Sequence, residues 1–183
     1  MKEVSDSASP EHKLVFGTED EARQMIGKEL RVRTAHVRVS AALSQLFCGI
    51  TEDGNASYWD EEFATRQWGG LTTPPGMLFS WSLPLSWAPG LPERPVPLPV
   101  AVPLPGDTVV NARQEADLYE PIRVGDRLII RESVADVSAE KSSHLGKGHF
   151  LTTRAVFERD DGTVVGEVRN IVFRYTAHKE VQQ

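Results

Sequence analysis

Residues 73–81, TPPGMLFSW, predict the centre of the fold. Pro74 and Pro75 stand where a helix can begin, because the first turn of a helix needs no backbone N–H donors. The residues that follow are apolar on nearly every side, and a helix of that kind is normally buried. Pro84 limits the helix or kinks it. We therefore expect a buried helix that starts near Pro75 and is enclosed by other elements.

The C-terminal part of the chain predicts the layer that encloses this helix. Four runs rich in β-branched and aromatic residues follow one another, with turn signals between them. The last two are joined by Asp160-Asp161-Gly162, which predicts a hairpin. The runs cover residues 108–119, 126–137, 150–159 and 163–175. An antiparallel sheet wrapped around one apolar helix satisfies this pattern, so the predicted class is α+β.

The N-terminal part predicts a disordered arm, one strand and several short helices. Residues 1–17 are rich in Ser and charge, which is typical of disorder. Thr18 and Glu21 have the spacing of a capping box, so a helix should begin there, with Gly27 at its end. The other predictions are a strand over residues 31–39, a helix from Ser40 with an apolar face (Ala42, Leu43, Leu46, Phe47, Ile50), a loop over 51–57, and a helix over 61–67 capped by Asp60.

Residues 84–105 hold eight of the chain's 12 prolines. Proline lacks the backbone donor that helices and central strands use, so we expect neither in this segment. The expected conformation is an extended loop on the surface, similar to polyproline. We place the domain at residues 18–178, with this loop inside it and a tail at residues 179–183.

Composition and charge exclude several classes of protein. The 183 residues carry 20 basic and 26 acidic side chains, so the basic excess of a nucleic-acid-binding protein is missing. Cys48 is the only cysteine, which excludes an internal disulfide and a cysteine-cluster metal site. The N-terminus has no apolar signal region, and prolines interrupt the most apolar stretch, residues 77–91. We expect an acidic cytoplasmic domain that binds neither nucleic acid nor membrane.

Three stretches carry short motifs with defined spacing: DGNASYWDEEFA at 53–64, GGLTTPPG at 69–76, and PIRVGDRL at 121–128 followed by GKGHFLT at 146–152. On these motifs the chain resembles the MaoC-like hot-dog family of acyl-thioester hydratases and dehydratases. The resemblance is strongest to its N-terminal MaoC-like dehydratase branch, which includes the larger subunit of steroid side-chain enoyl-CoA hydratases. It runs from about Met25 to Tyr175.

This resemblance implies a single hot-dog fold, an antiparallel sheet curled around the helix near Pro75. The family works as pairs of hot dogs with sites at their interface. One chain of this length supplies one hot dog, so the expected partner is a MaoC-like subunit that carries Asp and His, or a second copy of this chain. The implied substrate is an acyl-CoA or acyl-carrier thioester, and no cofactor or metal is expected.

Hydration of an enoyl thioester needs a base for water, an acid for Cα and a donor for the enolate oxygen. In active relatives an Asp and a His five residues later supply acid and base, and a backbone N–H at the start of the central helix supplies the donor. Asp53 matches the Asp and Gly76 matches the donor, but Tyr58 stands in place of His. A tyrosine, with a pKa near ~10, is a poor base at neutral pH. Either Asp53 and Tyr58 form an altered site, or this half-site is degenerate and Tyr58 only packs.

Other residues have weaker assignments. Substrate contacts are expected from Asn55, Trp59, Pro75 and Trp81. Asn55 could instead form an Asx turn, and the tryptophans could serve the core or a subunit interface. The histidines lack metal-ligand spacing. His36, in an alternating strand, should be structural or exposed. By default His144 and His149 are solvated loop residues, but either could reach a site. Cys48 should be a buried, inert thiol.

Three functions remain open at this stage, and a hot-dog thioesterase is a weaker fourth because the motifs match the hydratase branch. The first is the supporting subunit of a heteromeric 2-enoyl-CoA hydratase, with a degenerate Asp/His site and a bulky substrate such as a steroid side chain. The second is a stand-alone homodimeric hydratase or dehydratase that uses Asp53. The third is a non-catalytic acyl-thioester binding module. The reaction class rests on the resemblance alone, because a fold does not define a reaction.

Overall fold

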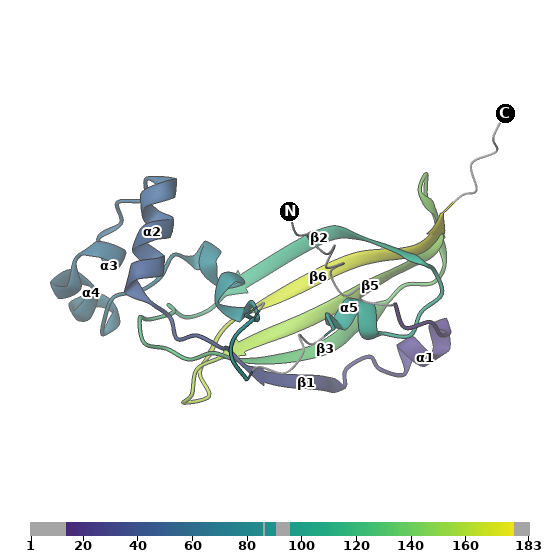
Figure 1. Ribbon diagram of the computed structural model, residues 1–183, viewed down its shortest axis with the longest axis horizontal. Helices are drawn as coiled ribbons and strands as arrows, with labels where there is room; N and C mark the ends of the chain where they lie inside the picture. The colour runs from purple at the N-terminus through teal and green to yellow at the C-terminus, as the bar shows by residue number, and fades with distance from the viewer. Residues whose placement is uncertain (1–13, 86, 91–95, 178–183) are drawn as a thin grey trace, which may run out of the picture.

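A computed structural model describes residues 14–85, 87–90 and 96–177, and predictions for residues 1–13 and 178–183 lie outside these ranges. The described residues form a six-stranded antiparallel sheet with strand order β1-β3-β5-β6-β2 and with β4 paired to β5 (Figure 1). The strands are β1 (Glu29–Thr34), β2 (Thr108–Leu118), β3 (Ile129–Val137), β4 (Lys141–Ser142), β5 (Gly146–Glu158) and β6 (Val164–Ala177). The predicted α+β class with an antiparallel sheet is confirmed.

The hairpin between β5 and β6 forms where the turn signal predicts it. The side chain of Asp161 accepts a hydrogen bond from the Thr163 N–H at 2.9 Å, and Gly162 has φ 83°. Such a left-handed conformation favours glycine. Along β5, Leu151, Thr153 and Phe157 are buried, so alternate residues of the strand face the core.

The segment that should form the central helix differs from the prediction. It makes two 3₁₀ turns, η1 (Pro75–Met77) and η2 (Ser80–Ser82), instead of one α-helix. Prolines bound it on both sides, so it is too short for cooperative α-helix formation. The Ser82 hydroxyl also donates to the Phe79 carbonyl at 2.7 Å, which satisfies that group locally. Met77, Leu78 and Trp81 are buried as expected, whereas Phe79 is half exposed.

The proline-rich segment is also more ordered than the sequence predicts. Residues Leu98–Ala101 form a one-turn helix, α5, with proline in its first turn. That placement removes no hydrogen bond, so the argument against a helix was wrong for one turn. Leu98, Val102 and Leu104 are buried in a second core cluster on the inner face of the sheet, so the segment is not a surface loop here.

The end of the predicted N-terminal arm packs against this segment. The Val15 N–H donates to the Val100 carbonyl at 3.1 Å, and the Leu104 N–H donates to the Val15 carbonyl at 3.4 Å. Within residues 14–17, therefore, the predicted disorder is wrong. These two backbone hydrogen bonds join Val15 to residues 100–104, a contact that no local sequence pattern predicts.

The described part of the chain has four further helices: α1 (Glu19–Arg23), α2 (Ala41–Thr51), α3 (Ala56–Trp59) and α4 (Glu61–Trp68). The capping box between Thr18 and Glu21 is present, although α1 ends before Gly27. The Asp60 side chain caps α4 by accepting from the Phe63 N–H at 2.9 Å, as predicted. The sequence predicted a loop where α3 lies. Figure 1 shows α2, α3 and α4 grouped beyond one end of the sheet.

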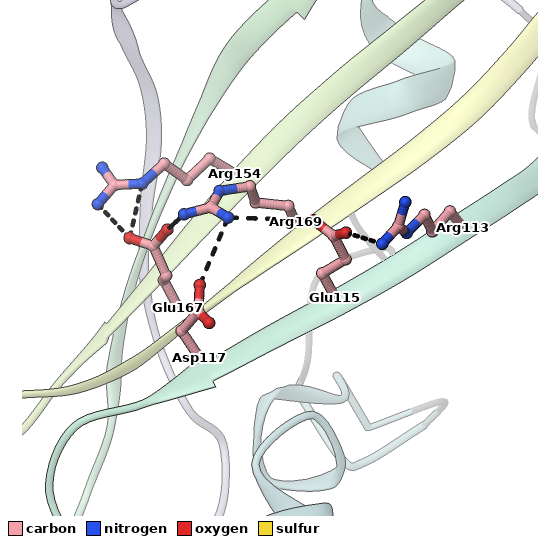
Figure 2. A network of polar contacts seen from close by, with 6 residues as sticks. All are labelled: Arg113, Glu115, Asp117, Arg154, Glu167 and Arg169. Carbon is pink, nitrogen blue, oxygen red and sulfur yellow. Dashed lines mark hydrogen bonds and ion pairs between the residues drawn. The ribbon is translucent and has the colours of Figure 1, made fainter.

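The outer face of β2, β5 and β6 carries a chain of ion pairs (Figure 2). Glu167 is only 3% exposed and accepts hydrogen bonds from both Arg154 and Arg169. Arg169 also lies 3.4 Å from Asp117 on the neighbouring strand. Buried carboxylates need such partners, because an unpaired buried charge is strongly destabilising.

Candidate functional site

A pocket of about 380 Å³ lies where α3, the turn η1 and the end of β2 meet. We call it the Tyr58 pocket. Its lining is Asn55, Ser57, Tyr58, Trp68, Thr72, Thr73, Pro75, Leu118, Tyr119, Glu120, Pro121 and Ile122. Three of the site residues predicted from the sequence, Asn55, Tyr58 and Pro75, are therefore brought together here.

Tyr58 lies in the short helix α3 and is 7% exposed. Burial raises the pKa of its phenol, and the nearby charge of Asp53 raises it further, while a hydrogen bond from Asn55 opposes them. Tyr58 is therefore a neutral hydroxyl at pH 7. It can donate a hydrogen bond to a ligand, but it cannot activate water as a base.

Asp53 is held by its own loop. Its carboxylate accepts a hydrogen bond from the Asn55 N–H at 3.1 Å, and its backbone carbonyl accepts one from the Trp59 indole at 2.8 Å. Asp53 does not line the Tyr58 pocket, although its charge acts on the Tyr58 phenol. To act as a base, the Asp53 carboxylate would have to reach a substrate in the Tyr58 pocket although it does not line that pocket.

Asn55 and Trp59 shape this loop. The Asn55 side chain accepts from the Ser57 N–H at 3.0 Å and so caps α3, which is the Asx-turn role left open by the sequence. Trp59 is 47% exposed and lies outside the pocket lining, with its indole N–H bound to Asp53. The structure thus gives both residues a structural role at the edge of the site.

Gly76 stands at the start of η1, where backbone N–H groups lack partners within the turn. Among the described residues, no carbonyl accepts a hydrogen bond from its N–H. An added Cβ at Gly76 would meet no atom within 4 Å, so the backbone here is open to an approaching ligand. This geometry suits an N–H that stabilises a developing oxyanion.

Trp81 lies away from these residues. It is 2% exposed in the core cluster around Met77 and Phe157, and no described group accepts a hydrogen bond from its indole N–H. It touches a separate groove of about 270 Å³ along α2, lined in addition by Val37, Leu43, Leu46, Phe47, Ile50, Met77 and Ser80. The predicted substrate contact at Trp81 is thus not part of the Tyr58 pocket.

The sequence missed the opposite wall of the pocket, residues 118–122. Two backbone contacts bring it there: the Thr73 N–H donates to the Ile122 carbonyl at 3.0 Å, and Thr72 forms an isolated bridge with Arg123. The motif GGLTTPPG marks Thr72 and Thr73, but nothing local indicates which distant segment lies against them. Glu120 is the only carboxylate among the lining residues of the pocket.

The structure decides the predictions for His149, Cys48 and His36. His149 is not a solvated loop residue, because it lies in β5 at 4% exposure with Nδ1 3.0 Å from the Ser138 carbonyl. The loop prediction failed because β5 extends back to Gly146. Cys48 is buried as predicted, and burial raises the pKa of its thiol, which keeps it protonated and unreactive. His36 is exposed in a bend.

Within residues 14–85, 87–90 and 96–177, no group of three His, Cys, Asp or Glu side chains is placed to hold a metal ion. Over the same ranges, no helix is both long enough and apolar enough to cross a membrane. The Tyr58 pocket offers a neutral hydroxyl and an apolar wall, and the free N–H of Gly76, which does not line it, follows the lining residue Pro75 in the chain.

Comparison with known proteins identifies the family. Residues 24–168 match the family model "FAS1-like, dehydratase domain region", so the chain belongs to this family of MaoC-like hot-dog hydratases and dehydratases. A protein of Thermomonospora curvata described as "Probable enoyl-CoA hydratase alpha subunit" is 30% identical over 141 residues, which is 71% of this chain and 43% of that protein. The chain thus spans less than half the length of this relative.

Solved structures agree on the fold. The ChsH1-ChsH2 complex from Mycobacterium tuberculosis matches with a TM-score of 0.66 at 18% identity, over 89% of this chain and 93% of the other. The MaoC-like dehydratase from Rhodospirillum rubrum matches with a TM-score of 0.56 at 21% identity, over 83% and 99%. The predicted hot-dog fold and the resemblance to MaoC-like proteins are confirmed.

Proposed function

We propose that this chain is the supporting subunit of a heteromeric acyl-thioester hydratase or dehydratase in the cytoplasm. Its partner is a second hot-dog chain that carries the Asp–His pair, and together they interconvert a 2-enoyl-CoA and a 3-hydroxyacyl-CoA. The observation that carries the proposal is the neutral phenol of Tyr58 at the position where active relatives have their histidine.

The division of labour follows from the chemistry. Addition of water to the enoyl thioester needs a base that titrates near neutral pH, and a buried phenol does not. The Gly76 N–H can still bind the thioester oxygen, and the Tyr58 hydroxyl can orient the ligand. This half of the assembly therefore binds and positions substrate, while the partner performs the proton transfers.

The surface of α2 supports a protein partner. Leu43, Leu46 and Ile50 are 48%, 63% and 76% exposed on this helix, which has no charged residue. The sequence predicted an apolar face here, and the chain alone leaves much of it in water. A continuous exposed apolar face of this kind marks an interaction surface, since monomers rarely keep one. The same apolar face lines the groove along α2 that Trp81 also lines.

The relatives support the same assignment. The matched protein of Thermomonospora curvata is named as an alpha subunit, which implies a complex, and the matched structure from Mycobacterium tuberculosis is a complex of two chains. The acyl group remains open, with a bulky substrate such as a steroid side chain as one case.

The decisive experiment is recovery of the tagged chain from its native host, with mass spectrometry of whatever copurifies in equal amount. We expect a hot-dog chain with an Asp–His pair, and hydration of crotonyl-CoA by the pair but not by this chain alone. Leu46→Asp should prevent copurification, whereas Glu61→Lys on the exposed side of α4 should not. Recovery of the chain only with itself would contradict the proposal.

A stand-alone homodimeric hydratase is the second candidate, favoured by the proximity of the Asp53 charge to the Tyr58 phenol. It predicts that the purified chain hydrates crotonyl-CoA alone and that Asp53→Asn abolishes this activity. Tyr58→His, which restores the spacing of the active relatives, separates the two readings further. If the half-site is degenerate, Tyr58→His should create hydratase activity in the purified chain. If Asp53 and Tyr58 form an altered active site, the same change should shift the pH profile of an activity that is already present. Acyl-CoA binding without turnover in any pairing would favour a binding module.

A further inference from the structure

A second cavity lies between the inner face of the sheet and the proline-rich segment. It has a volume of about 380 Å³ and shares no lining residue with the Tyr58 pocket. Ala155 and Val168 form its floor, Phe79 and Leu83 one wall, and Leu98 the other. We call it the sheet cavity. Its size and apolar walls are those of small-molecule sites in proteins.

The charged groups at the rim of the sheet cavity are already paired. Arg33 donates to the Ser82 carbonyl at 2.5 Å and lies 3.4 Å from the Glu132 carboxylate. Arg31 donates to the Val96 carbonyl at 2.9 Å and lies 3.7 Å from the same carboxylate. These bonds join the sheet to the segments that form the walls. The guanidinium of Arg154, whose residue also lines the cavity, is bound by Glu167.

One polar side chain in the sheet cavity is not paired. The carboxamide oxygen of Asn170 is buried, and no described group donates a hydrogen bond to it. Thr153, opposite Asn170 on β5, donates its hydroxyl to the Asn170 backbone carbonyl at 3.4 Å and not to the side chain. A buried acceptor without a donor destabilises a protein, so its presence beside a cavity points to a ligand that supplies the donor.

We propose that the sheet cavity binds a neutral aliphatic ligand that carries a hydroxyl group, with the hydroxyl hydrogen-bonded to the Asn170 carboxamide. The aliphatic part lies against Ala155, Val168 and Leu98. A hydroxyl both donates and accepts, so it can pair with either end of the carboxamide. A carboxylate suits the site less well than a hydroxyl, since it offers no proton to the Asn170 oxygen and would leave that acceptor unpaired. This site is independent of the proposed function at Tyr58.

Two isomeric probes test the proposal, 1-octanol and heptyl methyl ether. They have the same atoms, but only the alcohol has a hydrogen-bond donor. Binding to the full chain is measured by NMR titration of the Leu98 and Val168 methyl groups. We expect 1-octanol to bind roughly three- to tenfold more tightly than the ether, the range that one added hydrogen bond gives.

Variants assign the preference to Asn170. Asn170→Leu should reduce the ratio of the two affinities to about one, while Asn111→Leu on the exposed edge strand β2 should leave it unchanged. Ala155→Leu, which narrows the cavity, should weaken both probes, and it decides the location if Asn170→Leu fails to fold. Equal affinity for both probes in the unaltered protein, methyl signals that do not move, or a preference that survives Asn170→Leu would each overturn the proposal.

Discussion

Arg174 offers the sharpest test of what holds the fold together. It is 0% exposed, and its guanidinium donates to three carbonyls: Gly106 at 3.1 Å, Val102 at 2.9 Å and Val15 at 2.7 Å. Burial lowers the pKa of the guanidinium. These bonds tie the N-terminal segment and the end of the proline-rich segment to β6. Arg174→Met keeps much of the aliphatic volume and removes every donor.

Two opposing effects set the change in the free energy of unfolding that Arg174→Met causes. The carbonyls of Gly106 and Val102 are buried, and a buried acceptor that loses its donor costs about 1–3 kcal/mol. Removal of a buried cation offsets part of this loss, because its desolvation costs several kcal/mol. We expect Arg174→Met to lower the free energy of unfolding by about 2–4 kcal/mol, which is large for one substitution.

The assay is urea denaturation of the full chain, followed by circular dichroism at one protein concentration. Arg38→Met is the matched control, because Arg38 is 59% exposed and the change should stay within about 0.5 kcal/mol. Limited proteolysis should also cut the N-terminal segment of Arg174→Met faster than that of the control. Equal stability of the two variants would refute the view that Arg174 holds these segments.

Three further predictions concern other parts of the molecule. Gly148→Ala should prevent folding or severely lower the melting temperature, because the new Cβ would lie 2.0 Å from a backbone oxygen of β6. The hydrogen bond from Arg154 lowers the pKa of Glu167, so the stabilisation by its ionised form is lost as the pH falls below the ordinary carboxyl range near ~4. Glu167→Gln should therefore flatten the loss of stability in urea titrations from pH ~5 to ~3. Ultraviolet titration should find Tyr58 ionising above an ordinary tyrosine, and Asp53→Asn should lower that pKa.

Each of these three predictions has a matched control variant. Gly49→Ala in α2 meets no atom within 4 Å and should raise stability by about 0.5–1 kcal/mol. Glu61→Gln, which removes an exposed carboxylate, should leave the loss of stability between pH ~5 and ~3 unchanged. Tyr119→Phe separates the signal of the second pocket tyrosine from that of Tyr58. A Tyr58 pKa that does not respond to Asp53→Asn would mean that the two side chains do not interact.

Local chemistry explains what the sequence predicted well. Thr18 with Glu21, and Asp60 with Phe63, are three residues apart, and Asp161 is two residues from Thr163, so each pair can hydrogen-bond whatever the rest of the chain does. Strand alternation likewise needs only neighbours. The resemblance to the family implied a histidine at the position of Tyr58, and the motifs contain Asn55, Tyr58 and Pro75, which line one pocket.

Structures that depend on distant partners were mispredicted or missed. Leu98, Val102 and Leu104 of the proline-rich segment are buried because they cluster with Val134, Leu151 and Val172 of the sheet, which are far away in sequence. The wall of the Tyr58 pocket that the sequence did not predict, residues 118–122, is held in place by the hydrogen bond from the Thr73 N–H to the Ile122 carbonyl. Asp53 is hydrogen-bonded within its own loop and Trp81 borders the groove along α2, so neither lines the Tyr58 pocket, and their roles toward substrate stay predictions.

The sequence by itself determined the class of the fold, the helix caps and the hairpin turn, since each depends on residues close along the chain. It also shows Tyr58 five residues after Asp53, where the family resemblance implies a histidine. Only the tertiary structure decided which side chains share a pocket and that His149 and Arg174 are buried. It alone revealed the unpaired carboxamide oxygen of Asn170 in the sheet cavity. These features depend on strand register and on contacts between segments far apart in sequence, and their energies exist only once the chain has folded.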